Sequence, residues 1–392
     1  MGGSLIFKDR RRLSPRYVPK LLPHREKQLK FLMSLYEDSL RDVSEVYLQV
    51  CQIVGGVGTG KTCTAIRFGE ILEEGASEKG IKLRHAYVNG KLETSSFTLY
   101  RSLLEAAVPG ISTRSLSPEE MLHRLLEMLE ERNQYLLITV DEIGYFCKYS
   151  KKDHVIYDLT RLNEMAMGRP GKVIGVNFIA RDLSFYSDLD ASERSTLGHI
   201  VLEFPQYSTD QVKDILEKRA EESFKPGCVD DELLTFISEL TIKPPINGDL
   251  RVGLDLLLYS GIYAENQGYN RVLPEHVRLV YSQTYPGFTS EDIFLLDYTG
   301  KMVLWGVVRA LQAERTSYVG LREIREYYKM VCEAQNVKPV LEVEEHLQDL
   351  INRGIVQMRS LTEFGVSDAS AEELENFLMG IAEKVKHGLV EE

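Results

Sequence analysis

The chain has 392 residues, of which 43% are hydrophobic and 27% are charged, with 59 acidic against 47 basic side chains. A chain of this length is expected to form two or three domains with ordinary buried cores, and its net charge of −12 argues against a protein that binds nucleic acid through bulk charge. The sequence contains no apolar run of membrane-spanning length and no signal-peptide core, so we expect a cytoplasmic protein without membrane contacts.

The first segment, residues 1–20, is basic. Residues 1–30 contain nine Lys and Arg side chains against two acidic ones, and Arg10, Arg11 and Arg12 are consecutive. Such a concentration of charge can attract a polyanion, but a solvated basic tail has the same composition. The sequence leaves both interpretations open.

Residues 55–62 read GGVGTGKT and fit the phosphate-binding loop (P-loop) pattern G-x-x-x-x-G-K-[ST]. The apolar residues 47–54 before the loop predict a buried strand, and the apolar spacing after it predicts a helix. Glycines let backbone N–H groups point at phosphate oxygens, and the helix dipole adds positive potential there. We predict that Lys61 reaches the β- and γ-phosphates of ATP or ADP and that Thr62 ligates Mg²⁺. The expected nucleotide-binding residues here are Val57, Gly58, Thr59, Gly60, Lys61, Thr62 and Cys63.

A second nucleotide-binding signal is the apolar segment 135–140, which ends in Asp141 and Glu142. We predict that Asp141 holds Mg²⁺ together with Thr62, and that Glu142 polarises the attacking water as a general base. A strand that merely ends in an acidic turn is the alternative interpretation. The pairing of this segment with a P-loop about eighty residues upstream favours the nucleotide site.

A third apolar strand, residues 172–177, ends in Asn177. A polar side chain at such a strand end can sense the γ-phosphate, which makes Asn177 a candidate for hydrolysis. An asparagine that caps a turn fits the same pattern.

The order of these signals predicts an α/β fold. Strands alternate with helices over residues 21–205, which predicts a parallel sheet with its sites at the carboxyl ends of the strands. Residues 206–286 read as helical, and residues 290–392 read as three short helices followed by a strand and an acidic helix. Arg251 begins a helical pattern in the middle region, where its guanidinium can bind phosphate or stay on the surface.

The last helical pattern has an apolar face, which we interpret as core packing in preference to a partner-binding surface. That face consists of Leu374, Phe377, Leu378, Ile381 and Val385.

Several segments together resemble one known family. They read LSPRYVP at 13–19, VDEI at 140–143, FPQY at 204–207, NGDLR at 247–251 and PEHVR at 274–278. These segments resemble the archaeal origin recognition complex/cell division control family of replication initiators, which are AAA+ ATPases with a helical lid and a C-terminal winged helix. The resemblance runs over nearly the whole chain and implies that architecture.

The resemblance also implies nucleotide contacts outside the P-loop. The N-terminal segment with Val18 and Arg25 is expected to pack on the adenine. Tyr207 and Arg219 are expected to flank the nucleotide from the start of the lid, and Arg251 is expected to reach the γ-phosphate. From the residues alone, Tyr207 reads as an ordinary core or rim aromatic.

Two positions depart from the family pattern in the ATPase domain. The first sensor of the family usually reads Ser-Asn-Asp, whereas Asn177 is followed by Phe178. The trans-acting arginine usually follows Leu-Asp-Pro, whereas this chain has Ser192 at that place and Arg194 two residues later. Both departures predict slow hydrolysis.

The winged helix departs as well, because its wing has one basic residue, Arg359, and the expected recognition helix 340–353 carries four carboxylates. Carboxylates repel DNA phosphates. The resemblance also implies a DNA-binding insertion at residues 109–116, for which an ordinary helix connection is the alternative. The candidate DNA contacts are Arg114, Arg322, Arg325, Lys329, Arg353 and Arg359.

The function implied is an ATP-binding replication initiator and slow ATPase that binds origin duplex DNA. Its implied partners are the replicative helicase, which it would help to recruit or load, and paralogous initiator subunits. A regulatory paralogue that acts mainly on protein partners is the alternative, as is a signalling P-loop ATPase. Binding of duplex DNA with and without ATP distinguishes the first reading from the others.

Overall fold

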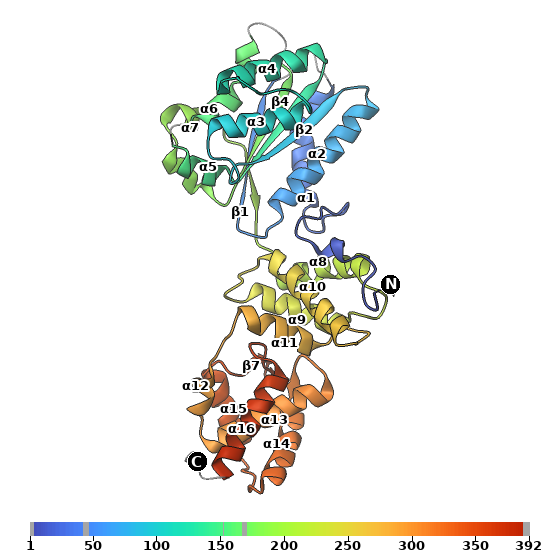
Figure 1. Ribbon diagram of the computed structural model, residues 1–392, viewed down its shortest axis with the longest axis vertical. Helices are drawn as coiled ribbons and strands as arrows, with labels where there is room; N and C mark the ends of the chain where they lie inside the picture. Colours follow the sequence, from blue (N-terminus) through green and yellow to red (C-terminus); the bar gives the residue numbers. More distant parts are fainter. Residues whose placement is uncertain (1–3, 42–46, 152, 167–170, 387–392) are drawn as a thin grey trace. The chain divides into compact units, whose positions relative to one another are not determined.

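The computed structural model describes residues 4–41, 47–151, 153–166 and 171–386 (Figure 1). It divides the chain into two compact units. Val18–Gln211 and Gly248–Leu250 form the first, which we call the sheet unit. Met1–Tyr17, Val212–Asn247 and Arg251–Glu392 form the second, which we call the helical unit.

The sheet unit contains a five-stranded parallel sheet in the order β2-β3-β4-β1-β5. Because β1 lies between β4 and β5, the chain leaves it at a point where the strand order reverses, and ligands of parallel sheets bind at such points. The strands are β1 Gln49–Gly55, β2 Leu83–Asn89, β3 Tyr135–Asp141, β4 Val173–Ala180 and β5 Val201–Phe204. The α-helices are α1 Glu26–Arg41, α2 Lys61–Glu78, α3 Ser96–Ala107, α4 Pro118–Glu131, α5 Ile143–Tyr149, α6 Val155–Thr160 and α7 Ala191–Thr196.

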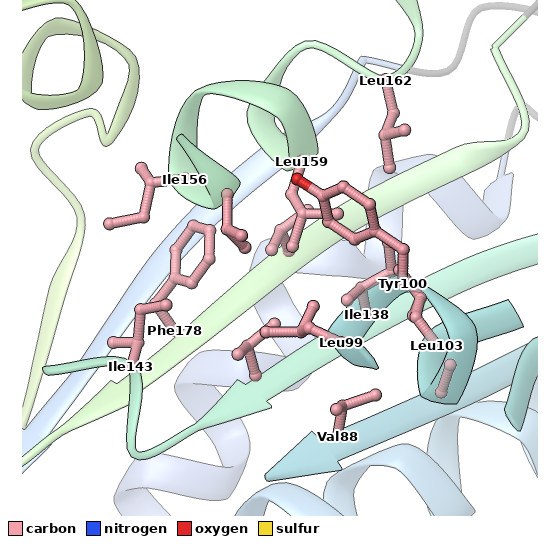
Figure 2. Packing of buried hydrophobic residues seen from close by; sticks show 14 of the residues in the cluster. Val88, Leu99, Tyr100, Leu103, Ile138, Ile143, Ile156, Leu159, Leu162 and Phe178 are labelled. Atoms are coloured by element: carbon pink, nitrogen blue, oxygen red, sulfur yellow. The ribbon is translucent and has the colours of Figure 1, made fainter. Parts of the chain in front are cut away.

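Helices cover both faces of the sheet, so every residue of β3 and β4 is buried. On one face, Ile138 and Phe178 pack with Leu99 and Leu159 from the covering helices (Figure 2). On the other face, α1 and α2 contribute their own apolar side chains. Parallel strands buried on both faces read as continuous apolar runs, which is why the sequence signals for β3 and β4 are clear.

The helical unit begins with four long helices and continues into a winged-helix arrangement. Its small antiparallel sheet has the order β6-β8-β7, with β6 Val319–Gly320, β7 Gln357–Ser360 and β8 Glu363–Gly365. The first helices are α8 Thr209–Ser223, α9 Asp231–Ile242, α10 Leu250–Asn266 and α11 Pro274–Thr284. The remaining helices are α12 Ser290–Phe294, α13 Tyr298–Glu314, α14 Leu321–Gln335, α15 Val343–Asn352 and α16 Ala371–Lys386.

The basic N-terminal segment is folded onto the helical unit. Phe7 forms a β-bridge with Phe224, and their ring centroids lie 4.7 Å apart. Ile6 and Leu13 are fully buried, and Arg10 pairs with Glu265. The interpretation as a solvated tail is therefore wrong for the described part of this segment, since its apolar side chains anchor it.

Arg278 of α11 joins the lid helices to the winged helix within the helical unit. Its side chain is 1% exposed, and it donates hydrogen bonds to the carbonyl oxygens of Val366, Thr316 and Ser317 at 2.6–2.9 Å. Burial lowers the pKa of Arg278, while the nearby Glu275 carboxylate opposes that shift. A buried cation that is fully bonded to backbone from another element is costly to separate, so these regions pack as one unit.

The acidic C-terminal helix, α16, belongs to the winged-helix core. Leu374, Leu378 and Ile381 are at most 5% exposed and pack in one cluster with α13. Glu375 accepts hydrogen bonds from Trp305 and Arg309 of α13. The prediction of core packing is confirmed for these residues, whereas the side chain of Val385 lies outside the described part of the chain. Among the described helices, none combines the length and the apolarity needed to cross a membrane.

Candidate functional site

The P-loop joins the end of β1 at Gly55 to the start of α2 at Lys61. Gly58 and Gly60 adopt positive φ angles of 72° and 86°, which favour glycine. The Lys61 ammonium donates to the carbonyl oxygens of Gly55 and Gly56 at 2.6 and 2.7 Å. Thr59 is fully buried and its hydroxyl donates to Gly56 O. The loop therefore presents its backbone and one lysine at a helix N-terminus, as anion binding requires.

Thr62 and Asp141 meet beside the P-loop, because β1 and β3 end at the same edge of the parallel sheet. The Thr62 hydroxyl donates to Asp141 Oδ2 at 2.6 Å. Tyr87 of β2 donates to the same oxygen at 2.8 Å, and the Glu142 N–H donates to Asp141 Oδ1 at 2.7 Å. Burial and the Asp141 charge raise the pKa of Tyr87, so its phenol stays protonated and holds the carboxylate in place.

Tyr87 was missed in the sequence analysis. It lies two residues before the end of β2, where it pairs with Thr139 of β3. A tyrosine in an apolar strand is a normal core residue, and only the register of β2 against β3 brings its hydroxyl to Asp141.

Glu142 lies next to Arg181, a second residue that the sequence analysis missed. Arg181 Nε is 3.7 Å from Glu142 Oε2, and the two side chains are 57% and 31% exposed. Glu142 has a φ of 53° at the N-cap of α5, which turns it out of the strand direction. Arg181 directly follows β4, whose last residue is Ala180.

The prediction that Asn177 senses a γ-phosphate is wrong. Asn177 is fully buried inside β4, three residues before the end of the strand, and pairs with Thr139 of β3. The Tyr36 hydroxyl of α1 donates to Asn177 Oδ1 at 2.8 Å. Its side chain therefore accepts a hydrogen bond from a buried tyrosine on the face that α1 covers, away from the strand ends where the P-loop lies.

Arg25 and Tyr207 form a buried pair on the other side of the P-loop. The Arg25 guanidinium lies 3.9 Å from the Tyr207 ring centroid and donates to Thr59 O at 2.9 Å and to Pro205 O at 2.8 Å. Burial lowers the pKa of Arg25 and raises that of Tyr207 to about 12. A Cβ atom at Gly60 would lie 2.7 Å from the Tyr207 hydroxyl, so this pair shapes the loop directly.

The adenine contacts of Val18 and Arg25 stay predictions, as does the expected position of Tyr207 beside the nucleotide. Val18 is half-buried in the sheet unit, as are Val57 and Cys63 at the P-loop. Their positions fit the nucleotide contacts implied by the resemblance without testing them.

Arg219 and Arg251 belong to the helical unit. Arg219 of α8 is 7% exposed, and its guanidinium donates to Arg12 O at 2.8 Å and to Tyr17 O at 3.2 Å. It also lies over the Tyr17 ring at 4.9 Å. Arg219 therefore holds the N-terminal segment against α8 within the helical unit. Arg251 is an exposed residue in the first turn of α10, and its contact with a γ-phosphate stays a prediction.

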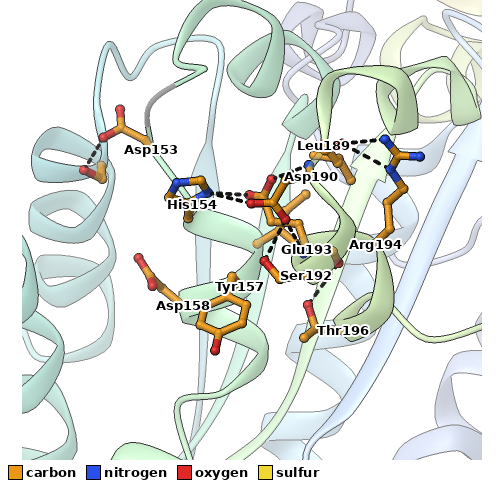
Figure 3. Close-up of polar contacts among 12 residues, drawn as sticks. Asp153, His154, Tyr157, Asp158, Leu189, Asp190, Ser192, Glu193, Arg194 and Thr196 are labelled. Atoms are coloured by element: carbon orange, nitrogen blue, oxygen red, sulfur yellow. Dashed lines mark hydrogen bonds and ion pairs between the residues drawn. The ribbon is translucent and has the colours of Figure 1, made fainter.

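Arg194, the candidate trans-acting arginine, bonds within its own unit. Its Nε and one terminal nitrogen both donate to Leu189 O, at 3.1 and 2.8 Å (Figure 3). The preceding Asp190 and Glu193 form a capping box that starts α7. A finger role would require Arg194 to release this carbonyl.

The candidate DNA-binding loop, residues 109–116, lies between α3 and α4 and is anchored to the core by its apolar side chains. Ile111 and Leu116 pack against the core of the sheet unit, and Gly110 and Ser115 have positive φ angles of 84° and 65°. Arg114 lies between them and is exposed. The loop therefore presents Arg114 outward, as a phosphate contact requires.

Three of the candidate DNA contacts in the winged helix are already paired. Arg325 of α14 pairs with Glu344, and Arg353 pairs with Asp349 at 2.7 Å. Arg359 of β7 lies 2.8 Å from Glu239 and over the Tyr318 ring. Each of these three arginines would have to exchange its carboxylate for a phosphate, and their DNA contacts stay predictions. Within the described residues, Arg322 and Lys329 are exposed and form no ion pair.

This site defines a P-loop fold of the AAA+ class, because a parallel sheet carries the P-loop after β1 and two carboxylates at the end of β3. A family model of the Cdc6 AAA+ ATPase-type lid domain matches residues 213–282. Cdc6p from Pyrobaculum aerophilum has a similar structure, with a TM-score of 0.79 at 27% identity over 98% of this chain and 100% of that one. The Aeropyrum pernix ORC1 protein in complex with DNA gives 0.65 at 30% identity over 97% and 98%.

Relatives in sequence give the same result. The chain is 30% identical over 361 residues to the ORC1-type DNA replication protein 2 of Saccharolobus solfataricus, which covers 91% of this chain and 87% of that protein. It is 31% identical over 358 residues to the ORC1-type DNA replication protein 1 of Aeropyrum pernix, over 91% and 88%. The chain therefore belongs to the family of ORC1-type DNA replication proteins, and the predicted family and fold class are confirmed.

Proposed function

We propose that the chain binds ATP or ADP with Mg²⁺ at the P-loop and uses the nucleotide state as a switch in replication initiation. The 2.6 Å contact between Thr62 and Asp141 carries the metal assignment, because it brings a hydroxyl and a carboxylate oxygen together at a helix N-terminus. Oxygen ligands of this kind suit Mg²⁺, which supplies charge neutralisation for the phosphates when bound. Lys61 adds the positive charge at the β- and γ-phosphates.

Glu142 is the proposed general base, and Arg181 restrains it. The ion pair holds the Glu142 carboxylate beside the guanidinium and so restricts its movement toward an attacking water. Slow hydrolysis is proposed because Arg194 is engaged with Leu189 O, and a slow rate suits a switch better than a motor. Arg251, in the first turn of α10, is the proposed sensor of the γ-phosphate.

We propose that the chain binds duplex DNA at a replication origin. Binding would help to recruit or load the replicative helicase. Paralogous initiator subunits are further proposed partners. Family membership supports this proposal, as does the DNA complex of the Aeropyrum pernix relative. In this chain the anchored loop with Arg114 and the α14 residues Arg322 and Lys329 are the proposed phosphate contacts. Contacts of this type position a protein on DNA without reading its bases.

A titration of duplex binding against salt tests the proposal. Each phosphate contact contributes about 0.9 to the salt slope, so Arg114→Ala should lower the slope by about that amount. Arg132→Ala is the matched control, because Arg132 is an exposed arginine at the C-cap of α4. Origin-like and random duplexes should be compared with ATP and with ADP. Absence of duplex binding at low salt under both conditions would refute the proposal.

The paired cations of the winged helix support a second candidate, a regulatory paralogue that acts mainly through protein partners. Arg325, Arg353 and Arg359 each face a carboxylate, which reduces the positive charge that this region offers to DNA. This candidate predicts ATP binding of ordinary strength together with equally weak binding to origin-like and random duplexes.

A further inference from the structure

Helix α5, which directly follows Glu142, turns an aromatic pair toward solvent. Ile143 and Phe146 are at most 1% exposed and fix the helix to the sheet unit. On the opposite face Tyr145 and Tyr149 are 40% and 66% exposed. Two large rings four residues apart on one helix face are neighbours, and their centroids lie 4.6 Å apart at an interplanar angle of 42°. Neither ring is buried in the core of the sheet unit, so packing does not explain why two aromatic side chains stand on this face.

Two lysines from different elements lie over these rings. Lys148 Nζ, from α5 itself, is 5.8 Å from the Tyr149 centroid, and Lys91 Nζ, from the turn after β2, is 5.6 Å from the Tyr145 centroid. The turn is held in place, because Lys91 N donates to Asn89 Oδ1 at 2.9 Å. We call Lys91, Tyr145, Lys148 and Tyr149 the α5 platform.

The turn and the helix are also joined through Gly90. Its N–H donates to Asp141 O at 2.8 Å, and a Cβ atom at this position would lie 3.1 Å from Phe146 Cβ. This close approach fixes the spacing between Lys91 and Tyr145. The α5 platform is therefore preformed, with little ordering left for a ligand to impose.

The positive charges of the α5 platform are not compensated. Lys91 and Lys148 form no ion pair with any carboxylate in the described ranges. Cations close to them are paired, since Lys151 lies 3.3 Å from Asp188 and Arg181 lies 3.7 Å from Glu142. The platform thus combines two partly exposed aromatic rings with two ammonium groups that form no ion pair among the described residues.

From this arrangement we infer that the α5 platform binds single-stranded nucleic acid. Unpaired bases can stack on Tyr145 and Tyr149, while Lys91 and Lys148 contact the phosphates on either side. Base faces in a duplex are covered by their neighbours, so the rings select unpaired strands. This activity goes beyond the proposed switch, because it requires neither a nucleotide at the P-loop nor the duplex contact of Arg114.

Fluorescence anisotropy of a labelled oligothymidylate with the full chain tests the inference. Tyr145→Ala and Tyr149→Ala should each weaken binding about tenfold, as loss of one base–aromatic stack does. Tyr145→Phe and Tyr149→Phe keep the ring face and should bind as the parent chain does. Tyr259→Ala is the control, because Tyr259 of α10 is 51% exposed without a cation over its ring among the described residues.

The lysines have a separate readout. Lys91→Gln and Lys148→Gln should each lower the salt slope of oligothymidylate binding by about 0.7, the contribution of one phosphate contact on a single strand. Lys79→Gln is the matched control, since Lys79 is an exposed residue at the C-cap of α2. A bromodeoxyuridine-substituted strand should crosslink on irradiation to the peptide that contains Tyr145 and Tyr149.

Three results would overturn the inference. The first is unchanged oligothymidylate binding in Tyr145→Ala and Tyr149→Ala chains whose thermal unfolding matches the parent. The second is an equal loss in the Phe and Ala variants, which would show that stacking is not involved. The third is an equal loss of duplex binding in the Ala variants, which would assign the surface to duplex DNA.

Discussion

Arg359 of β7 and Glu239 of α9 form an ion pair with 2.8 Å between Nε and Oε1. The Tyr318 hydroxyl donates to the other oxygen of Glu239 at 2.7 Å, and the Arg359 guanidinium lies 5.3 Å from the Tyr318 ring centroid. The one basic residue of the wing is therefore held against a lid helix. A cation in this position contributes to packing within the helical unit before it can contribute to DNA binding.

Arg359→Ala should leave duplex affinity nearly unchanged, because the guanidinium is already paired. Glu239→Gln should release Arg359 and steepen the salt slope of duplex binding by about 0.9. It should also lower the free energy of unfolding by about 1 kcal/mol, as loss of a partly exposed pair does. A loss of duplex binding in Arg359→Ala as large as that in Arg114→Ala would contradict this picture.

Glu142→Gln should keep ATP bound and reduce turnover about hundredfold or more, since a positioned general base contributes at least that factor. Nucleotide affinity from equilibrium binding and phosphate release from a steady-state assay separate the two effects. Turnover at the parent rate would show that another group activates the water.

Arg181→Ala should raise the rate of hydrolysis, by about fivefold at most. The pair with Glu142 is exposed, and such pairs contribute about 1 kcal/mol or less, which sets this limit. Arg181→Lys keeps the charge and is the control. A tenfold fall in phosphate release in Arg181→Ala would instead place the guanidinium on the reacting phosphate.

Asn177→Ala should destabilise the fold without affecting hydrolysis. It leaves the Tyr36 hydroxyl without its acceptor inside the protein, at a cost of about 1–3 kcal/mol. Chemical denaturation measures this change, and a double-mutant cycle with Tyr36→Phe isolates the hydrogen bond. A stable Asn177→Ala chain with impaired hydrolysis would restore the role that the sequence suggested.

His85 of β2 should make stability depend on pH. Burial lowers its pKa to about 4, and its Nε2 lies 2.9 Å from Thr139 Oγ1. Between about pH 6.5 and pH 4 the unfolded chain binds a proton that the folded chain does not. Stability from this group is therefore present above about pH 6.5 and is lost as the pH falls, by at most about 1.4 kcal/mol per pH unit. Denaturation at about pH 7 and pH 5 should show a smaller difference in His85→Gln.

The nucleotide site was predictable from sequence where its residues are consecutive. Residues 55–62 form the phosphate-binding loop that their sequence pattern predicts. The glycine conformations and the following helix are local properties of the chain, so the pattern is sufficient to predict them. Asp141 was equally clear, since a strand buried on both faces reads as an apolar run up to its last residue. Asn177 misled because a polar residue was read as the end of the strand, whereas the apolar run resumes at Phe178 and β4 continues to Ala180.

The remaining features depend on residues far apart in the chain. Tyr87 reaches Asp141 only through the register of β2 against β3, and no periodicity within either strand encodes that register. The positive charge of Arg359 was visible in the sequence, but its pairing with Glu239, 120 positions away, was not. Local patterns predicted the P-loop and the alternation of strands and helices along the chain, and several short motifs together indicated the family. Tertiary packing decided which charges are free, because an ion pair is set by distance in space, which local sequence does not constrain.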